Sequence, residues 1–133
     1  TADDADGVQA ALALVPANSS SYPLARQHWA EYLAGHPRSV SDLNLALLTA
    51  DSAGFGRRRR AEIGVDVYRQ ALERVEKDGP IPGDKIGPYL VNSDGVRSGL
   101  EAALRALADA TESPLERMRL IDEANEVRPW SFV

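Results

Sequence analysis

Six segments of this chain have the residue spacing of amphipathic helices, and this pattern restricts the fold more than any other feature. Within each segment, apolar residues recur at intervals of three and four, which places them on one face of a helix. Gly, Pro and short polar runs separate the segments and act as helix breakers. The segments span residues 3–15, 22–35, 41–53, 57–77, 94–110 and 114–128.

The last of these segments has the clearest boundaries. Ser113 is suited to cap a helix, Pro114 suits the first helical position, and Glu116 completes a capping box. Pro129 ends the helix. Ala124 stands five residues before Pro129, a spacing typical of the second helix of a tetratricopeptide unit.

The same spacing occurs near the start of the chain, between Ala11 and Pro16. The distance from Pro16 to Pro129 is close to three periods of about 34 residues plus one long loop. We therefore expect a degenerate tetratricopeptide-like array in which the first helix is the closing half of a unit. The alternatives are a chance recurrence in an Ala-rich chain and a general α-helical bundle.

The long loop is expected at residues 78–92, which are rich in Gly and Pro. We predict little helical or strand character there. The only strand candidate is Tyr89-Leu90-Val91, which is too short to pair alone. The sequence leaves open whether this loop is ordered.

Composition restricts the class of protein further. The chain has 133 residues, enough for one domain, and 44% hydrophobic residues, too many for wholesale disorder. It has no cysteine, no apolar run long enough to span a membrane and no visible signal peptide, so we expect a cytoplasmic location. A net charge of −5 argues against nucleic-acid binding. Because the chain starts with Thr, we expect residues 1–133 to be a single domain at the C-terminus of a longer protein.

Short motifs along most of the chain resemble, in order and spacing, the C-terminal tetratricopeptide region of the actinobacterial protein kinase G family. The residues that carry this resemblance are Val15-Pro16, Ser19, Tyr22, Ala25-Arg26, Ser41-Asp42-Leu43, Arg97, Gly99-Leu100-Glu101, Leu104-Arg105, Leu107-Ala108, Arg117, Leu120-Ile121-Asp122, Ala124-Asn125 and Val127-Arg128-Pro129.

The resemblance implies a non-catalytic regulatory module. In that family the region follows a serine/threonine kinase domain, helps to hold the polypeptide together and supports dimer formation. The family's kinases act on a small regulatory protein linked to central carbon and nitrogen metabolism. The 78–92 segment does not look like the family, which weakens any inference about an interface built from it.

A run of four arginines is the strongest charge feature of the sequence. It stands at the expected N-terminus of a helix, where cations oppose the helix dipole at a cost of a few tenths of a kcal/mol each. Asp51, Glu62, Asp66 or an acidic partner protein could offset that cost. The run is therefore either an anchor for an acidic protein surface or a solvated turn with internal salt bridges, and we favour the turn because such pairs are common and weak. The four residues are Arg57, Arg58, Arg59 and Arg60.

Two aromatic residues, Trp130 and Phe132, follow the last helix. Aromatic side chains in such a position either fold back onto the core or bury themselves in a partner. We expect them to contribute either to self-association and docking or to packing within the chain.

Catalytic signals are missing from the sequence. It contains no Gly-rich phosphate loop after a strand, no His-Arg-Asp and no Asp-Phe-Gly, which a kinase domain needs. Gly54-Phe55-Gly56 is interpreted as a turn between helices. The two histidines, His28 and His36, have no carboxylate at ligand spacing, so we expect neither a metal nor a cofactor.

The sequence thus predicts an all-α, tetratricopeptide-like domain of about six helices with one long loop. Its expected role is protein interaction, dimerisation and regulation of a protein-kinase-G-like kinase, with a second copy or the kinase domain as partner. The first alternative is a free-standing adaptor, which needs an open groove with polar anchors such as Asn44, Arg26 and Arg69. A small helical enzyme is the least favoured alternative.

Overall fold

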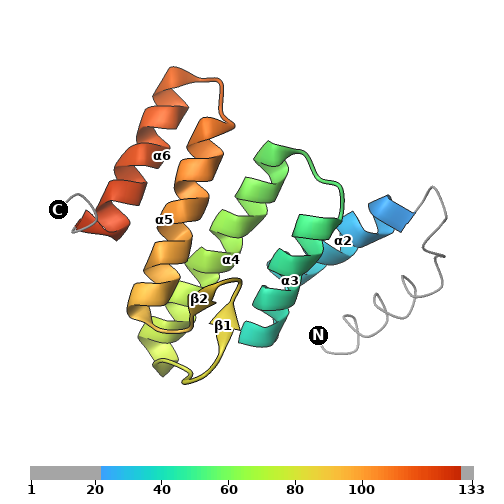
Figure 1. Ribbon diagram of the computed structural model, residues 1–133, viewed down its shortest axis with the longest axis vertical. Coiled ribbons are helices and arrows are strands. Elements are labelled where there is room, and N and C mark those ends of the chain that lie inside the picture. Colours follow the sequence, from blue (N-terminus) through green and yellow to red (C-terminus); the bar gives the residue numbers. More distant parts are fainter. Residues whose placement is uncertain (1–21, 130–133) are drawn as a thin grey trace.

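A computed structural model of the chain describes residues 22–129, which form five helices and one short β-hairpin (Figure 1). The all-α class is confirmed, and each described helix starts and ends within one residue of its predicted position. The helix expected at 3–15 and the aromatic residues Trp130 and Phe132 lie outside the described residues. The elements are α2 (Tyr22–Gly35), α3 (Val40–Ser52), α4 (Arg57–Asp78), β1 (Lys85–Ile86), β2 (Tyr89–Leu90), α5 (Ser93–Asp109) and α6 (Pro114–Val127).

Side-chain caps start three of the helices. Ser39, Asn92 and Ser113 each accept a hydrogen bond from the backbone N–H three residues later, and so satisfy one of the free donors at a helix N-terminus. The predicted cap at Ser113 is confirmed. The predicted capping box is wrong, because the Glu116 carboxylate pairs with Arg58 on α4 and does not bond back to Ser113.

The helices alternate between two layers. Helices α2, α4 and α6 form one layer, and α3 and α5 form the other (Figure 1). Helix α4 is central, since it packs against α2, α3 and α5 and forms ion pairs with α6. The core lies between the layers, where Leu33, Leu43, Ile63 and Leu104 are fully buried.

The segment predicted to be a long loop contains a short antiparallel hairpin with two residues in each strand, so its strand character is small, as expected. Lys85 pairs with Leu90 and Ile86 with Tyr89, and the positive φ angle of 58° at Gly87 makes the tight turn possible. The hairpin lies in front of α4, between α3 and α5 (Figure 1). Its position depends on contacts with distant helices, which a local sequence pattern does not reveal.

Three helices hold the hairpin in place. The Tyr68 hydroxyl of α4 donates to the Ile86 carbonyl at 3.0 Å, and the Gly87 N–H donates to the Asn44 side chain of α3 at 2.9 Å. On the α5 side, a Cβ atom at Gly95 would overlap the backbone of Leu90, so only glycine permits this close approach. Ile86 itself is fully buried and anchors the hairpin in the core.

The described residues fit a tetratricopeptide-like array of helices. They contain five of the about six predicted helices. Ala11 and Pro16 lie outside residues 22–129, so the predicted spacing of three periods between the two Ala-x4-Pro motifs stays a prediction.

Candidate interaction surfaces

The arginine run forms the first turn of α4, and no group in that turn offsets its positive charge. The N-cap residue, Gly56, has no capping side chain, and the first turn of α4 carries no acidic residue. Partners come from neighbouring helices and from Glu62 in the second turn of α4. The Arg57 guanidinium donates to the Asp109 carbonyl at 3.0 Å, at the end of α5, where backbone carbonyls lack partners within the helix.

Arg58 and Arg59 belong to a chain of ion pairs that crosses three helices. Glu31 of α2 lies 3.5 Å from Arg59, which also lies 3.6 Å from Glu62. Glu62 lies 4.0 Å from Arg58, and Arg58 lies 3.3 Å from Glu116 of α6. We call these five residues the ion-pair chain. It joins α2, α4 and α6 along one layer of the fold.

The ion-pair chain supplies acidic partners for Arg58 and Arg59, two of the four arginines of the run. Glu62 is a partner, as one of the predicted options required, whereas Asp51 and Asp66 are not among the partners of the run. Because its side chains are about half exposed, each pair contributes at most about 1 kcal/mol. Within residues 22–129, the Arg60 side chain makes no hydrogen bond or ion pair, and it is exposed.

The polar anchors predicted for an adaptor groove do not converge on one surface. Asn44 holds the hairpin, and Arg26 donates to the Ser52 hydroxyl at 2.9 Å. Arg69 forms a two-pronged ion pair with Glu123 of α6, with Nη2–Oε1 at 2.6 Å. All three side chains are thus engaged within the chain, and the predicted groove is not formed from them.

Helix α6 exposes three large apolar side chains. Leu115 is 58% exposed, Met118 56% and Ile121 36%, and they follow one another at intervals of three residues. Only Ala124 of this helix is fully buried. We call Leu115, Met118 and Ile121 the α6 stripe. An exposed apolar stripe of this kind is typical of an interaction surface.

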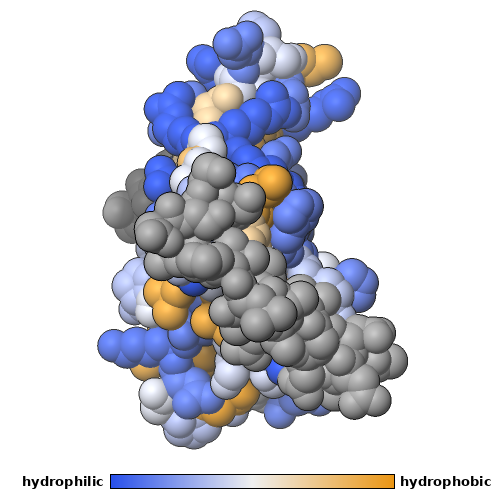
Figure 2. Space-filling view, turned by 90° about the vertical axis from the view of Figure 1, so that its right-hand side faces the viewer, coloured by the Kyte–Doolittle hydropathy of each residue, from blue (hydrophilic) through white to orange (hydrophobic). Residues whose placement is uncertain are grey.

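The opposite side of the molecule differs. Figure 2 shows the side on which α2 and α3 lie, and outside the grey atoms its hydrophobic residues form separate small areas divided by hydrophilic ones. Leu24, Leu45 and Leu48 are exposed on α2 and α3. Leu45 and Leu48 make a pair three residues apart, shorter than the α6 stripe, and single exposed leucines such as Leu24 are normal on a protein surface.

Glu101 is a buried acid whose role the sequence did not reveal. It accepts hydrogen bonds from Arg105 at 3.0 Å and from Arg128 at 3.1 Å, and Arg105 also donates to Asn125 of α6. The resemblance included these residues as motif positions only. Their spacing is ordinary for a helix surface, so sequence alone gave no signal that they fasten the end of α6 to α5.

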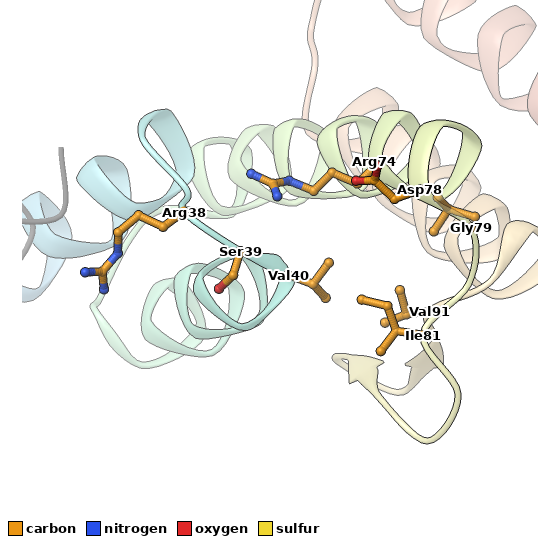
Figure 3. Close-up of a pocket in the computed structure, with 9 residues that line it drawn as sticks. Arg38, Ser39, Val40, Arg74, Asp78, Gly79, Ile81 and Val91 are labelled. Atoms are coloured by element: carbon orange, nitrogen blue, oxygen red, sulfur yellow. The ribbon is translucent and has the colours of Figure 1, made fainter.

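A small pocket of about 220 Å³ lies beside the N-terminus of α3 (Figure 3). Val40, Ile81 and Val91 point toward one another in it, whereas Arg38 points away. Arg74, at its edge, donates to the Pro37 carbonyl at 3.0 Å. Its charged groups therefore do not converge on a common centre, as they do in most ligand sites.

The carboxyl group of Asp42 fastens the turn between α2 and α3. It accepts hydrogen bonds from the Arg38 backbone N–H at 2.9 Å and from the Arg38 guanidinium at 3.0 Å. Burial by itself would raise the pKa of Asp42. The Arg38 hydrogen bonds and the charges of Arg38 and Arg74 outweigh burial and hold the pKa below its ordinary value.

A second hollow, of about 260 Å³, lies between α3, α4 and α5 next to the hairpin; we call it the α3–α5 groove. Leu47 of α3 and the rings of Tyr68 and Tyr89 line one end, and these two rings pack edge to face at 5.8 Å. Arg57 and Arg60 line the other end. Its lining is mainly apolar.

Small residues account for the groove. Gly64 of α4 and Ala103 of α5 meet so closely that a Cβ atom on Gly64 would lie 3.4 Å from the Ala103 Cβ. At Gly99 a Cβ atom would overlap the Tyr68 ring. The two helices therefore cross with short side chains between them, and the surface above is hollow. Glycines inside predicted helices, here Gly64 and Gly99, are the sequence signal for this feature, which was not predicted.

The described residues form neither a metal site nor a membrane-spanning helix. Residues 22–129 contain no group of three or more His, Asp or Glu side chains that could hold a metal ion. None of the described helices is both long and apolar enough to cross a membrane. His36 stacks on Tyr32 at 4.7 Å and has a local packing role.

Comparison with known protein families gives a match over nearly the whole chain. The family model for the protein kinase G tetratricopeptide repeat matches residues 1–131. The matched range includes residues 78–92, which the sequence resemblance had set apart. No curated protein matches the chain.

Proposed function

The chain belongs to the protein kinase G tetratricopeptide repeat family, and from this premise we propose that it forms dimers and regulates a serine/threonine kinase carried by the same polypeptide. A tetratricopeptide-like domain is a protein-interaction module, and domains of this type are typically non-catalytic. We thus propose three things: that the domain forms dimers, that the same polypeptide carries a kinase, and that the protein is cytoplasmic.

The α6 stripe is the observation that carries the proposal of a dimer. It lies on the last described helix, and a stripe of Leu115, Met118 and Ile121 costs free energy when it remains in water. Two copies related by a two-fold axis would bury each other's stripe, since the same patch then serves both partners.

The ion-pair chain supports a regulatory role. It links α2, α4 and α6, so that α6 is held at a defined angle to the rest of the array. The Arg69–Glu123 pair and the Glu101–Arg128 contact fix the other end of α6. A rigidly held terminal helix would transmit the geometry of a dimer to the domain attached to it.

The dimer is tested by changing the α6 stripe. Replacing Leu115 and Met118 together by Glu puts two charges on the proposed interface, where burying them without partners is unfavourable. Light scattering coupled to size exclusion should show a dimer for the unaltered chain and a monomer for the variant. Because both side chains are exposed, the melting temperature of the variant at low concentration should stay close to that of the unaltered chain.

The matched control is Leu48→Glu on α3, which alters an equally exposed leucine away from α6. It should leave the dimer intact. A monomeric unaltered chain, or a dimer that survives both changes on α6, would contradict the proposed interface. The kinase is tested by reading the codons upstream of Thr1, where a kinase catalytic segment supports the proposal and a start codon directly before Thr1 refutes it.

A free-standing adaptor is the second candidate. The predicted anchors Asn44, Arg26 and Arg69 give it no support, because all three are engaged within the chain. The observation that favours it is the α3–α5 groove, which lies on the other layer of the fold.

A further inference from the structure

The size of the α3–α5 groove restricts what can occupy it. Its volume of about 260 Å³ is below the roughly 300–1,000 Å³ of ordinary small-molecule sites. The floor comes from Ala61 and Gly64 of α4, and one wall comes from Ala103 and Ala106 of α5. A hollow of this size has room for one or two side chains of a polypeptide.

The surface of the groove favours an apolar side chain. Tyr68 presents its ring to the groove, because its hydroxyl donates to the Ile86 carbonyl. Burial, together with the nearby Tyr89 and Asp51, raises the pKa of Tyr68 well above its ordinary value, so the phenol stays neutral. Covering this lining removes apolar area from water, which is the main driving force for association.

The positive charge at the N-terminal end of α4 favours a ligand in which an acidic residue stands next to the apolar side chain. Arg60 is exposed and has no partner among residues 22–129, while Arg57 is held by the Asp109 carbonyl. The whole chain carries a net charge of −5, so this positive rim is a local exception.

We propose that the α3–α5 groove binds a peptide segment of a protein partner in which a bulky apolar side chain stands next to an acidic residue. The apolar side chain fills the hollow between Tyr68 and Ala103, and the carboxylate pairs with Arg60. The choice of a protein as the partner rests on the interaction function proposed above. It does not depend on the α6 stripe, so dimer formation and peptide binding are separable.

The experiment is an NMR titration of the ¹⁵N-labelled 133-residue chain with three peptides whose ends are acetylated and amidated. The first is Asp-Glu-Leu-Phe-Asp-Glu. The second replaces its acids by Lys, and the third replaces Leu and Phe by Ser. We expect the first peptide to shift the amide signals of Gly64, Gly99 and Ala103, and the other two to bind at least about tenfold more weakly, the loss typical of one missing charge pair or apolar anchor.

Two variants locate the site. Arg60→Glu should weaken binding of the first peptide about tenfold or more without lowering the melting temperature, because an acid in the first turn of α4 favours the helix. Arg119→Glu, an exposed arginine of α6, is the matched control and should bind like the unaltered chain. Ala106→Leu places a larger helix-forming residue in the groove and should abolish the shifts.

Several results would overturn the proposal. These are the absence of shifts with the first peptide, equal binding by Arg60→Glu, and shifts that map to α6. Groove signals that move with protein concentration alone would assign the groove to a second copy of this chain and would also overturn it. Light scattering on Ala106→Leu separates the two proposals, because this variant should retain the dimer.

Discussion

The two layers of this fold are held together by different physical means. Helices α2, α4 and α6 are linked by half-exposed ion pairs such as Arg58–Glu116 and Arg69–Glu123. Helices α3 and α5 are joined through a hairpin whose Ile86 is fully buried and whose backbone is held by Tyr68. Exposed ion pairs set orientation at little gain in stability, whereas buried apolar contacts supply most of the stability. Ion pairs therefore position α6, and buried apolar contacts keep the chain folded.

The largest expected effect lies on the hairpin side. Ile86→Ala removes a fully buried side chain and leaves a cavity, so we expect the free energy of unfolding to fall by about 2–4 kcal/mol. Urea denaturation followed by circular dichroism measures this change. Leu90→Ala, on the exposed face of the same hairpin, is the control and should cost less than about 1 kcal/mol. Equal losses for the two variants would mean that the hairpin is not part of the core.

An intermediate case is Asp42, a charged group that is only 11% exposed. Its pKa is lowered in the folded chain, so it binds protons more weakly than in the unfolded chain. Its contribution to stability is present above the ordinary Asp pKa and is lost as the pH falls through the lowered value. We expect Asp42→Asn to reduce the pH dependence of the melting temperature in this acid range. A pH profile unchanged in the variant would show that Asp42 is not the group responsible.

The smallest effect is expected for the ion-pair chain. Arg58→Ala removes two pairs with half-exposed partners and should lower the free energy of unfolding by less than about 1 kcal/mol. The difference from the unaltered chain should shrink further at 1 M salt, because salt screens exposed charges. Thermal melts at low and high salt provide the measurement. A loss as large as that of Ile86→Ala would remove the distinction between the two layers.

Local patterns predicted much of the fold. Apolar spacing and breakers were sufficient to place α2 to α6, because each helix is amphipathic and each ends at Gly, Pro or a polar run. The cap at Ser113 was predicted for the same reason: it depends on residues three apart. Glu116 was assigned to that cap as well, but a long side chain also reaches another helix, and here it reaches Arg58.

Contacts between distant residues were not predictable in this way. The hairpin forms because Asn44 and Tyr68 make hydrogen bonds with backbone groups of residues 86 and 87. Nothing in the sequence of residues 78–92 indicates those partners. The polar anchors failed for a related reason. Arg26 and Arg69 are the residue types that peptide grooves use, but residue type does not reveal whether a nearer acceptor already holds the side chain.

The hairpin also affects how the chain unfolds. In an ordinary repeat array each unit contacts only its neighbours, so that its stability is a sum of local terms and its ends open separately. Here β1 touches α3 and β2 touches α5, two helices that are not adjacent in the chain. The hairpin thus connects α3 and α5 across α4, and none of these three helices can unfold without breaking its contacts with the hairpin. We therefore expect the backbone amides of α3, α4 and α5 to exchange with solvent as one cooperative unit, with α6 exchanging earlier.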